Sequence, residues 1–259
     1  MAADFTYDAY AALLDDLHRR DGPVLTVREY LEAESVPDGA VVLRHDVDRK
    51  PKNALDHARL ESDRGLSSTY YVRTEQGAFD PAVIREIASL GHEVGYHYED
   101  LDRSDGDVDA AHRSFGTNLE RVRRLVDVDT VCMHGNPLTP HDNRDMWASG
   151  PDFESYDLLG EAYLSVEFTG LQYYSDTGRT WRDGALKVKD HPVGEAATTV
   201  PIETTFQLRR LLEAFPDTRF YLLTHPERWT NSVPERVIET SFDVAKNTAK
   251  FALDLASRR

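Results

Sequence analysis

Short apolar segments rich in β-branched and aromatic residues alternate with longer amphipathic segments along most of this chain. The short segments have the length and composition of β-strands, whereas the longer ones repeat apolar residues every three or four positions, as helices do. Parallel strands need a crossover connection between them, and that connection is usually a helix. The alternation therefore predicts an α/β protein built on a parallel sheet or barrel.

Two helices, at residues 5–20 and 26–35, are expected before the first strand. Strands are then expected at 40–46, 66–73, 92–99, 130–135, 171–175 and 219–225, and helices at 52–64, 80–91, 107–126, 201–215 and 233–257. Residues 136–193 are less periodic and predict long loops. The 259 residues contain no repeat or low-complexity linker, which fits one domain over 1–259 with a helical N-terminal extension at about 1–38.

The composition argues against several classes of partner. The formal net charge of −16 repels nucleic acid and anionic membranes, so neither is expected as a partner. Neither a long apolar run nor a basic and apolar leader is present, which predicts no membrane span and a cytoplasmic location. Abundant acids with 24 arginines and only six lysines suggest a halophile-like surface adapted to high salt. The single cysteine, Cys132, is expected to be a buried apolar residue.

Four polar side chains follow the apolar start of the first predicted strand, in the stretch VVLRHDVDRKP. Successive side chains of a strand point to opposite faces, so Arg44, Asp46 and Asp48 are expected on one face. His45 is expected on the other face. Two carboxylates on one face suit a metal ligand beside a base, at the strand end where α/β proteins keep their chemistry.

Three later strands also end in a histidine: His97, His134 and His225. A single histidine at a strand end is more often a solvated or capping residue than a ligand. The carboxyl ends of parallel strands meet at one rim, however, so the coincidence over four strands favours a functional site. Glu99 is expected on the same strand face as His97.

The stretches LRHDVD, GHEVGYHYED, CMHGNP and LLTH, in this order, resemble the polysaccharide deacetylase family (NodB homology, carbohydrate esterase family 4). The resemblance covers roughly residues 40–230. It implies a distorted, TIM-like (β/α) barrel of about seven strands, to which the N-terminal helices are added. It also implies a hydrolase that uses a divalent metal, usually zinc, to remove N- or O-acetyl groups from sugars.

The family motifs assign roles to residues of this sequence. The resemblance implies that Asp46 is the catalytic base, Asp48 a metal ligand and His225 the catalytic acid. The two aspartates are adjacent in the family and separated by one residue here. His97 matches the first of two histidine ligands that the family spaces four residues apart, but the second position is Leu101, which cannot bind a metal.

The leucine leaves the predicted metal site one ligand short, because a catalytic zinc normally has three protein ligands and an open position. His134 is preferred to Glu99 as the third ligand, since an imidazole would restore the Asp-His-His set of the family. A weak two-ligand site or no metal is the remaining alternative. Zn²⁺ suits this donor set best, with Mn²⁺, Co²⁺ or Ni²⁺ also possible.

Other residues carry weaker expectations. Arg44 is expected to orient Asp46 or to hold a substrate carboxylate, and a structural ion pair fits equally well. Asn136 follows a strand end and is a candidate for binding substrate in the cleft. His92 is interpreted as structural. The stretch YSDTGRTW predicts a hairpin or tight turn, and no role is assigned to it.

Three functional hypotheses follow. The first is a metal-dependent deacetylase of an N-acetylated sugar or a sugar-containing precursor. The second is a hydrolase of another C–N bond, of the cyclic amide type, on the same barrel. The third is a metal-free, non-catalytic binding protein, motivated by Leu101. Retention of Asp46 and His225 favours an enzyme, since a binding protein needs neither a base nor an acid.

Overall fold

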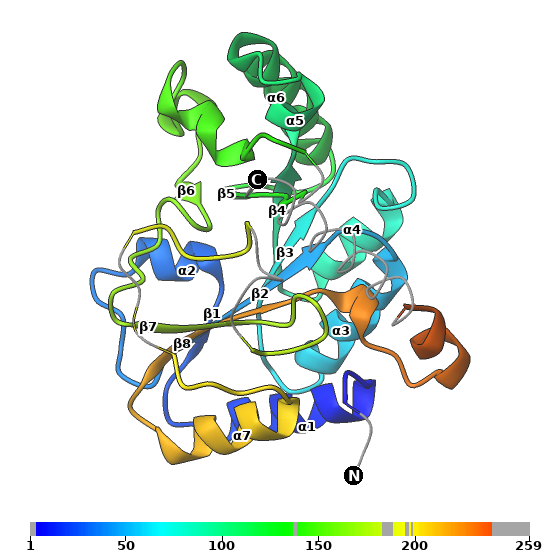
Figure 1. The fold of residues 1–259 in the computed structure, drawn as a ribbon, viewed down its shortest axis with the longest axis vertical. Helices are drawn as coiled ribbons and strands as arrows, with labels where there is room; N and C mark the ends of the chain where they lie inside the picture. The colour runs from blue at the N-terminus through cyan, green and yellow to red at the C-terminus, as the bar shows by residue number, and fades with distance from the viewer. Residues whose placement is uncertain (1–3, 137–138, 183–188, 195–196, 198, 240–259) are drawn as a thin grey trace, which may run out of the picture.

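The computed structural model describes residues 4–136, 139–182, 189–194, 197 and 199–239. Its parallel strands form one sheet in the spatial order β6-β5-β4-β3-β2-β8-β7, and the short β1 pairs with β2 beside this path. The strands are β1 (Val24–Leu25), β2 (Val41–Val47), β3 (Thr69–Val72), β4 (Glu93–Tyr98), β5 (Thr130–Met133), β6 (Gly160–Glu161), β7 (Leu171–Ser175) and β8 (Arg219–Thr224). The sheet curls into a half-barrel (Figure 1), which confirms the distorted α/β barrel expected from the sequence.

Helices connect the strands from β1 to β5 and β7 to β8, as the alternation predicts, whereas 3-10 turns join β5 to β6 and no helix lies in the described segment between β6 and β7. The helices are α1 (Tyr7–His18), α2 (Val27–Glu32), α3 (Pro51–Ser62), α4 (Pro81–Ser89), α5 (Asp100–Arg103), α6 (Val108–Arg123) and α7 (Thr205–Ala214). The 3-10 turns are η1 (Asn143–Ala148), η2 (Glu154–Tyr156) and η3 (Pro226–Arg228). Figure 1 shows α1 and α7 side by side along one edge of the molecule, with α3 packed beside β2.

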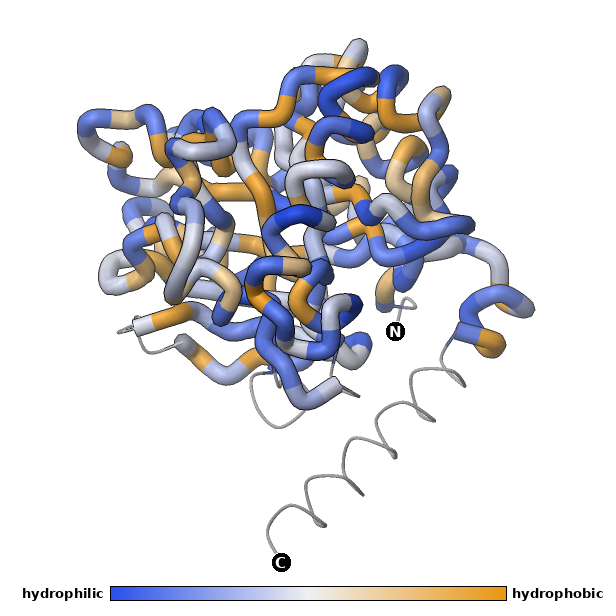
Figure 2. Tube along the Cα trace, turned by 90° about the horizontal axis from the view of Figure 1, so that it is seen from above, coloured by the Kyte–Doolittle hydropathy of each residue, from blue (hydrophilic) through white to orange (hydrophobic). Residues whose placement is uncertain are grey.

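Two apolar clusters hold these layers together, and Figure 2 shows apolar stretches running through the middle of the molecule. One cluster fills the half-barrel and extends to α4 and α6. The other lies between α1, α7 and the outer faces of β2 and β8. Buried apolar surface contributes about 25 cal/mol per Å², so these clusters supply the main driving force for folding.

Strand β2 is buried along its whole length and carries different side chains on its two faces. Val41 and Leu43 belong to the cluster against α1 and α7. His45 lies on the same face and contacts Glu61 of α3. The opposite face carries Arg44 beside Asp46, as the alternation of strand side chains predicts.

Some element boundaries follow the predicted signals and others differ. Helix α4 begins after Asp80, whose carboxylate accepts the N–H groups of the first turn, and it ends before Gly91 at φ +94°. Helix α2 is shorter than predicted, because its backbone becomes extended at Ala33. Of the predicted closing helix, residues 233–239 are helical, and residues 240–257 lie outside the described residues.

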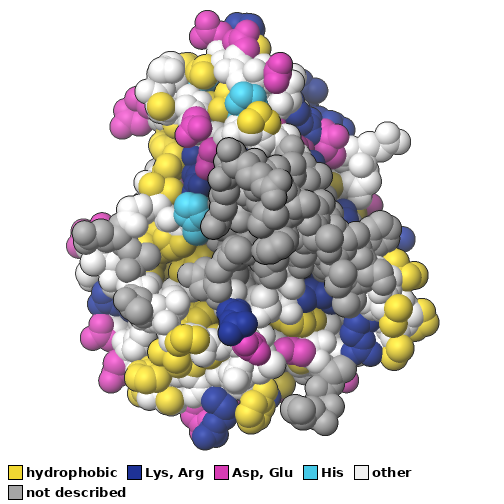
Figure 3. All heavy atoms as spheres, in the orientation of Figure 1, with side chains coloured by type: hydrophobic (Ala, Val, Ile, Leu, Met, Phe, Trp, Pro, Cys, Tyr) yellow, Lys and Arg dark blue, Asp and Glu magenta, His cyan; other side chains and the backbone are white. Residues whose placement is uncertain are grey.

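The visible surface mixes both signs of charge. Figure 3 shows Asp and Glu side chains interspersed with Lys and Arg on this face. Interspersed charges reduce the repulsion that a net charge of −16 would otherwise produce. In the described part of the chain, every helix is too short or too polar to cross a membrane.

Candidate metal centre and active site

The predicted site residues lie where parallel strands end. Asp46 is in the last residues of β2, and Asp48 directly follows that strand. His97 lies near the end of β4. His134 and His225 directly follow β5 and β8. Because all these strands run in the same direction, the five side chains lie at the same rim of the half-barrel.

Asp48 lies between two histidines at this rim. Its Oδ1 atom is 3.4 Å from Nε2 of His97 and 3.4 Å from Nε2 of His134. The two imidazole rings are nearly perpendicular, with centroids 5.3 Å apart. The Oδ2 atom of Asp46 is 3.8 Å from Nε2 of His97, so the predicted base lies beside the same group. We call Asp48, His97 and His134 the rim cluster.

The rim cluster fits a divalent metal. The Oδ1 atom of Asp48 is buried and has no hydrogen-bond partner among the described residues, although two imidazole nitrogens lie nearby. A buried carboxylate oxygen without a partner is unfavourable. Two ligands on one tetrahedral zinc, each at about 2.1 Å, are themselves about 3.4 Å apart. The separation of Asp48 Oδ1 from each imidazole nitrogen and the chemistry of the three donors therefore suit a zinc-type ion.

Glu99 supports His134 from behind. Its Oε2 atom is 3.2 Å from Nδ1 of His134, the ring nitrogen directed away from Asp48. Arg73 Nη2 donates to both carboxylate oxygens of Glu99, at 2.5 and 2.7 Å, and Arg103 contacts the same carboxylate. Burial opposes ionisation, but His134 and Arg73 hold the pKa of Glu99 well below its usual range. A carboxylate behind a histidine ligand typically orients that ligand.

Leu101, at the position where the family carries its second histidine, lies in α5. The side chain is buried in the apolar cluster that fills the half-barrel. It supplies packing and no donor atom. His134, on a neighbouring strand end, faces Asp48 instead.

The ring of His97 is oriented by the backbone. Its Nδ1–H donates to the carbonyl of Cys132 at 3.0 Å, which leaves Nε2 directed at Asp48. The thiol of Cys132 also lies close to Asp46 and His97, so these three side chains form an alternative ligand group. Burial raises the pKa of the Cys132 thiol well above its usual value. The thiol donates to the carbonyl of Met133 at 3.3 Å, whereas Oδ1 of Asp48 has no such partner among the described residues, which favours Asp48 and His134 as partners of His97.

Arg44 holds Asp46 from inside the half-barrel. Its Nε donates to Oδ1 at 2.9 Å, and its Nη2 donates to Oδ2 at 2.7 Å. The guanidinium is fully buried and lies 4.3 Å from the centroid of the Tyr163 ring. Burial opposes ionisation of Asp46, but Arg44 and His97 lower the pKa of this carboxyl. The contacts are those of an orienting residue, because a guanidinium enclosed in this way cannot reach a substrate.

His225 is held by a buried carboxylate that the sequence analysis did not assign. Nδ1 of His225 lies 2.7 Å from Oδ1 of Asp176, and its backbone N–H donates to Oδ2 at 3.0 Å. Arg228 and Trp229 also donate to Asp176, at 2.9 and 2.8 Å. Nη1 of Arg228 also lies 2.8 Å from Nδ1 of His225, so both partners are on the Nδ1 side and Nε2 is the ring nitrogen without them.

The environment favours a protonated His225. Burial and Arg228 lower the pKa of His225, but Asp176 and Asp48 outweigh them and raise it to about 9. The ring is therefore charged at neutral pH, as a proton donor must be. The influence of Asp48 on this pKa also links His225 to the rim cluster.

Asp176 directly follows β7, in the stretch YSDTGRTW. The predicted turn is present, since the N–H of Arg179 donates to the carbonyl of Asp176 and Gly178 has φ +79°. The available signal was the strand end itself, because 171–175 was expected to be a strand and an aspartate follows it at once. The turn and the carboxylate that holds His225 occupy the same residues.

Glu227 is a second residue that the sequence analysis missed. It lies in η3, two residues beyond His225, and is buried. Burial and the charge of Asp48 raise the pKa of Glu227 to about 7. Arg49 Nε is 3.8 Å from its Oε1 atom. The site therefore carries another carboxyl group near Asp48, from a segment for which the sequence analysis predicts no element.

The remaining predicted residues lie at the edges of the site. Asn136 is in the loop after β5, two residues beyond His134, and its carbonyl accepts a hydrogen bond from Thr139 Oγ1 at 3.0 Å. His92 lies between helix and sheet, where its Nε2 donates to the carbonyl of Ala58 at 2.9 Å. Its contacts are those of a structural residue.

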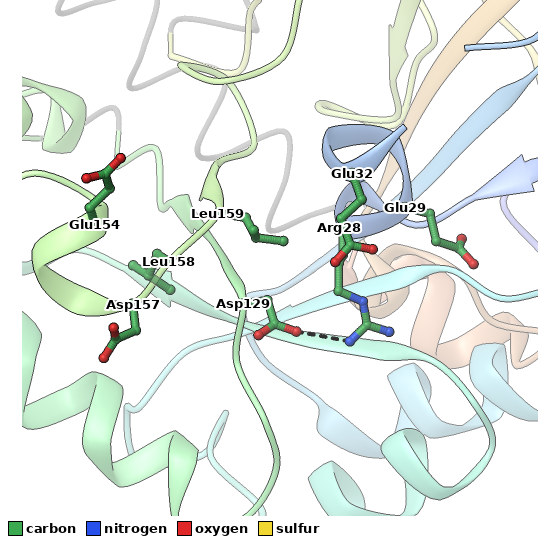
Figure 4. Close-up of a pocket in the computed structure, with 8 residues that line it drawn as sticks. All are labelled: Arg28, Glu29, Glu32, Asp129, Glu154, Asp157, Leu158 and Leu159. Carbon is green, nitrogen blue, oxygen red and sulfur yellow. Dashed lines mark hydrogen bonds and ion pairs between the residues drawn. The ribbon is translucent and has the colours of Figure 1, made fainter. Parts of the chain in front are cut away.

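A separate cavity of about 700 Å³ lies at the other end of the strands (Figure 4). It is lined by Arg28, Glu29, Glu32, Asp129, Glu154, Asp157, Leu158 and Leu159. Asp129 directly precedes β5, whereas His134 directly follows it, so the strand separates this cavity from the rim cluster. An ion pair of 3.0 Å joins Arg28 to Asp129. The lining carries no arrangement of base, acid and ligand like that at the rim.

No protein-family model matches the sequence, and no curated protein matches it significantly. The fold is similar to solved structures from carbohydrate esterase family 4. A protein assigned as a polysaccharide deacetylase, from Mycobacterium smegmatis, is 18% identical with a TM-score of 0.48, over 82% of this chain and 85% of that chain. A peptidoglycan N-acetylglucosamine deacetylase is 16% identical with a TM-score of 0.42, over 82% and 83%.

A pseudoenzyme of the same family, from Bacillus anthracis, is 12% identical with a TM-score of 0.41. The match covers 82% of this chain and 62% of that one, so this chain spans less than two thirds of that protein. These structures include polysaccharide deacetylases, the family that the motifs resemble. At these identities the likeness concerns the fold, and the roles of individual residues rest on the geometry of this chain.

Proposed function

We propose that this protein is a divalent-metal-dependent deacetylase that removes an acetyl group from an N-acetylated sugar or a sugar-containing precursor. The observation that carries the proposal is the position of Asp48 Oδ1, 3.4 Å from Nε2 of both His97 and His134. These three residues would hold the metal, with zinc as the best-suited ion. When bound, the metal would polarise the acetyl carbonyl and lower the pKa of the attacking water.

Asp46 would accept a proton from the attacking water. Arg44 keeps this carboxylate ionised and fixes both of its oxygens, so that the base does not turn away from the rim. The fixed geometry supports catalysis, because an oriented base does not have to be ordered again during the reaction. The lowered pKa of Asp46 means that its gain of a proton is transient.

His225 would donate a proton to the nitrogen of the departing amine. An unprotonated amine is a poor leaving group, and the raised pKa of His225 supplies the proton at neutral pH. Asp176 directs Nδ1 of His225 inward and thereby leaves Nε2–H for the substrate. Asp46 lies near the end of β2 and His225 directly follows β8. These two strands are neighbours that pair in parallel, so the proposed base and acid lie on adjacent strand ends.

The residues that orient the proposed base and acid favour a catalytic protein over one that only binds its ligand. A binding protein gains nothing from an orienting carboxylate behind His225 or from a buried guanidinium behind Asp46. Glu227 is buried like Arg44 and offers a substrate no contact, so the choice of a sugar as substrate rests on the resemblance to polysaccharide deacetylases.

The test combines metal analysis with an acetate-release assay. Protein purified without chelator should contain close to one zinc-type ion at the rim cluster and release acetate from N-acetylated amino sugars. Removal of the metal should abolish release, and added Zn²⁺ should restore it. Asp48→Asn is the matched control. This variant should neither bind metal at the rim cluster nor release acetate.

Other results would distinguish the remaining hypotheses. Hydrolysis of cyclic amides without acetate release would favour the second hypothesis. Sugar binding by calorimetry, with no turnover at any metal load, would favour a non-catalytic protein. A rim cluster that remains empty at high Zn²⁺ concentration would contradict the proposed ligand set.

A further inference from the structure

A second group of two histidines and a carboxylate lies behind β2. His45 leaves the strand on the face opposite Asp46, and His57 and Glu61 lie one turn apart on α3. All three side chains are fully buried. Their donor atoms lie within 4.8 Å of one another. We call His45, His57 and Glu61 the buried cluster.

His57 is a buried polar residue without, in the described part of the chain, the hydrogen bonds that would normally accompany its burial. Both of its ring nitrogens are buried and lack a hydrogen-bond partner among the described residues. The ring stacks on Tyr10, with centroids 4.0 Å apart and planes at 14°, and meets the edge of Trp229. Buried polar atoms are nearly always paired, so two unpaired nitrogens on one ring point to a missing partner.

The other two residues have the supports that metal ligands usually have. Nδ1 of His45 is 2.6 Å from Thr224 Oγ1, and its Nε2 is 2.8 Å from Oε1 of Glu61. The other oxygen of Glu61, Oε2, accepts hydrogen bonds from Ser68 and Tyr70 at 2.5 and 2.9 Å. The far atom of each residue is thus anchored, while the near atoms face one another, and Oε1 of Glu61 also accepts from the hydroxyl of Tyr10. This is the pattern by which surrounding groups orient ligands.

The protonation states are compatible with metal binding. Burial and the neighbouring His45 lower the pKa of His57 to about 3, so its ring is neutral and keeps a lone pair. A metal would require the Nδ1–H form of His45, and Thr224 Oγ1 is placed to accept that hydrogen. Hydrogen bonds and the neighbouring histidines outweigh burial and lower the pKa of Glu61 to about 2, which keeps its carboxylate charged.

We propose that the buried cluster is a second metal site, in which His45, His57 and Glu61 bind a zinc-class divalent cation. Two imidazoles and a carboxylate form a donor set that suits zinc. The site is enclosed, so its role is structural: it joins α3 to β2, the strand that carries Asp46 into the active site. The proposal is independent of the rim cluster and of the reaction assigned to it.

The competing explanation is that His57 only fills space between aromatic rings. A phenylalanine would fill the same space and stack equally well on Tyr10. If His57 serves packing alone, His57→Phe should be neutral or stabilising, because it removes two unpaired polar atoms. If His57 is a ligand, the same change should remove a metal ion.

The experiment measures zinc per chain after loading with Zn²⁺ and dialysis against a weak chelator. We expect close to two zinc ions in the wild type and close to one in His57→Phe. The variant Asp48→Asn/His134→Ala, which removes the rim cluster, should also keep close to one, and the three changes combined should leave none. Zinc should raise the melting temperature of the rim-cluster variant but not that of the triple variant.

Each outcome decides between the two sites. Equal zinc content in the wild type and His57→Phe would overturn the proposal, and so would a rim-cluster variant that binds none. Failure of the proposed function would give a different result. The wild type would then lack the zinc that depends on Asp48 but keep the zinc that depends on His57. If His57→Phe does not fold, anomalous scattering at the zinc edge from wild-type crystals decides. A peak among His45, His57 and Glu61 supports the site, and its absence at full zinc load contradicts it.

Discussion

The rim cluster and the buried cluster have the same donor types and differ in access to solvent. In the rim cluster the side chains of Asp48 and His134 are 22% and 14% exposed, whereas those of His45 and Glu61 are 0% exposed. The carboxylate lies 3.4 Å from the nearest imidazole nitrogen in the rim cluster, whereas Glu61 lies 2.8 Å from His45 in the buried cluster. An exposed group of ligands has room for a substrate, and an enclosed group has room only for an ion.

The surroundings of the two clusters differ accordingly. Beside the rim lie a fixed carboxylate, Asp46, and a protonated histidine, His225, which are the two groups that amide hydrolysis needs. Around the buried cluster lie Tyr10, Tyr70 and Trp229, which offer packing and hydrogen bonds but no route for a substrate. Ligand chemistry alone therefore does not identify a catalytic site. The groups within reach of an open position do.

The largest expected effect is that of Asp48→Asn. The amide keeps the shape of the side chain but is a much weaker ligand, so the rim should lose its metal and acetate release should fall to background. Stability should fall less than at a fully buried carboxylate, because the Asp48 side chain is 22% exposed and water can solvate part of the amide. Metal content and turnover, measured on the same sample, check the prediction. Full activity without rim metal would show that the reaction does not need it.

Asp46→Asn should lower turnover by about 10²- to 10⁴-fold, the usual contribution of a positioned general base. Rim metal should be retained, because Asp48 and the histidines remain. The comparison with Asp48→Asn separates base from ligand by metal analysis. Equal loss of metal in both variants would mean that the two aspartates act together as ligands.

His225→Gln should slow hydrolysis of an amide by about 10²-fold. A substrate with a good leaving group needs no proton from the acid, so its hydrolysis should be affected far less. Turnover of an N-acetyl sugar and of an activated acetate ester measures the difference. Equal losses on both substrates would assign His225 a role other than proton donation.

Glu61→Gln should affect stability rather than chemistry. The carboxylate accepts hydrogen bonds from Tyr10, Ser68 and Tyr70 and contacts His45, and an amide cannot accept all of them. We expect the free energy of unfolding of the metal-free protein to fall by about 1–3 kcal/mol. Urea unfolding measures this change, with Asp48→Asn as the matched control at the rim. A larger loss in Asp48→Asn would reverse the contrast between the clusters.

Much of the fold and the position of the rim cluster could be predicted from the sequence, because both depend on local patterns. Strand and helix periods gave the order of elements, and parallel strands bring their ends together wherever they lie in the chain. That placed Asp48, His97 and His134 at one rim, although the sequence alone left Glu99 open as a ligand. Arg103 pairs with Glu99 at a local spacing of four residues, but Arg73 comes from another segment, and no local pattern indicates its pairing with Glu99.

The residues that were missed depend on long-range contacts. Asp176 meets His225 from 49 positions away, and the turn chemistry of its own segment hid its second role. The buried cluster was equally hidden. His57 and Glu61 read as ordinary positions of an amphipathic helix, and His45 was placed only on the opposite face from Asp46. Their proximity arises when α3 packs on β2, which periodicity does not specify.

The smallest expected effect is a shift in pH dependence. Asp176 raises the pKa of His225 to about 9, against the opposing effects of burial and Arg228. Activity that needs a protonated His225 should therefore be present below this value and decline as the pH rises through it. In Asp176→Asn the raising charge is lost and both opposing effects remain, so the basic limb should move to lower pH. A shift of one pH unit corresponds to about 1.4 kcal/mol in the difference between the two protonation states.

The pH profile of kcat/KM for both proteins checks the prediction, and Asn136→Ala is a control at the edge of the site that should leave the basic limb in place. A limb unchanged in Asp176→Asn would mean that a different group controls the loss of activity at high pH.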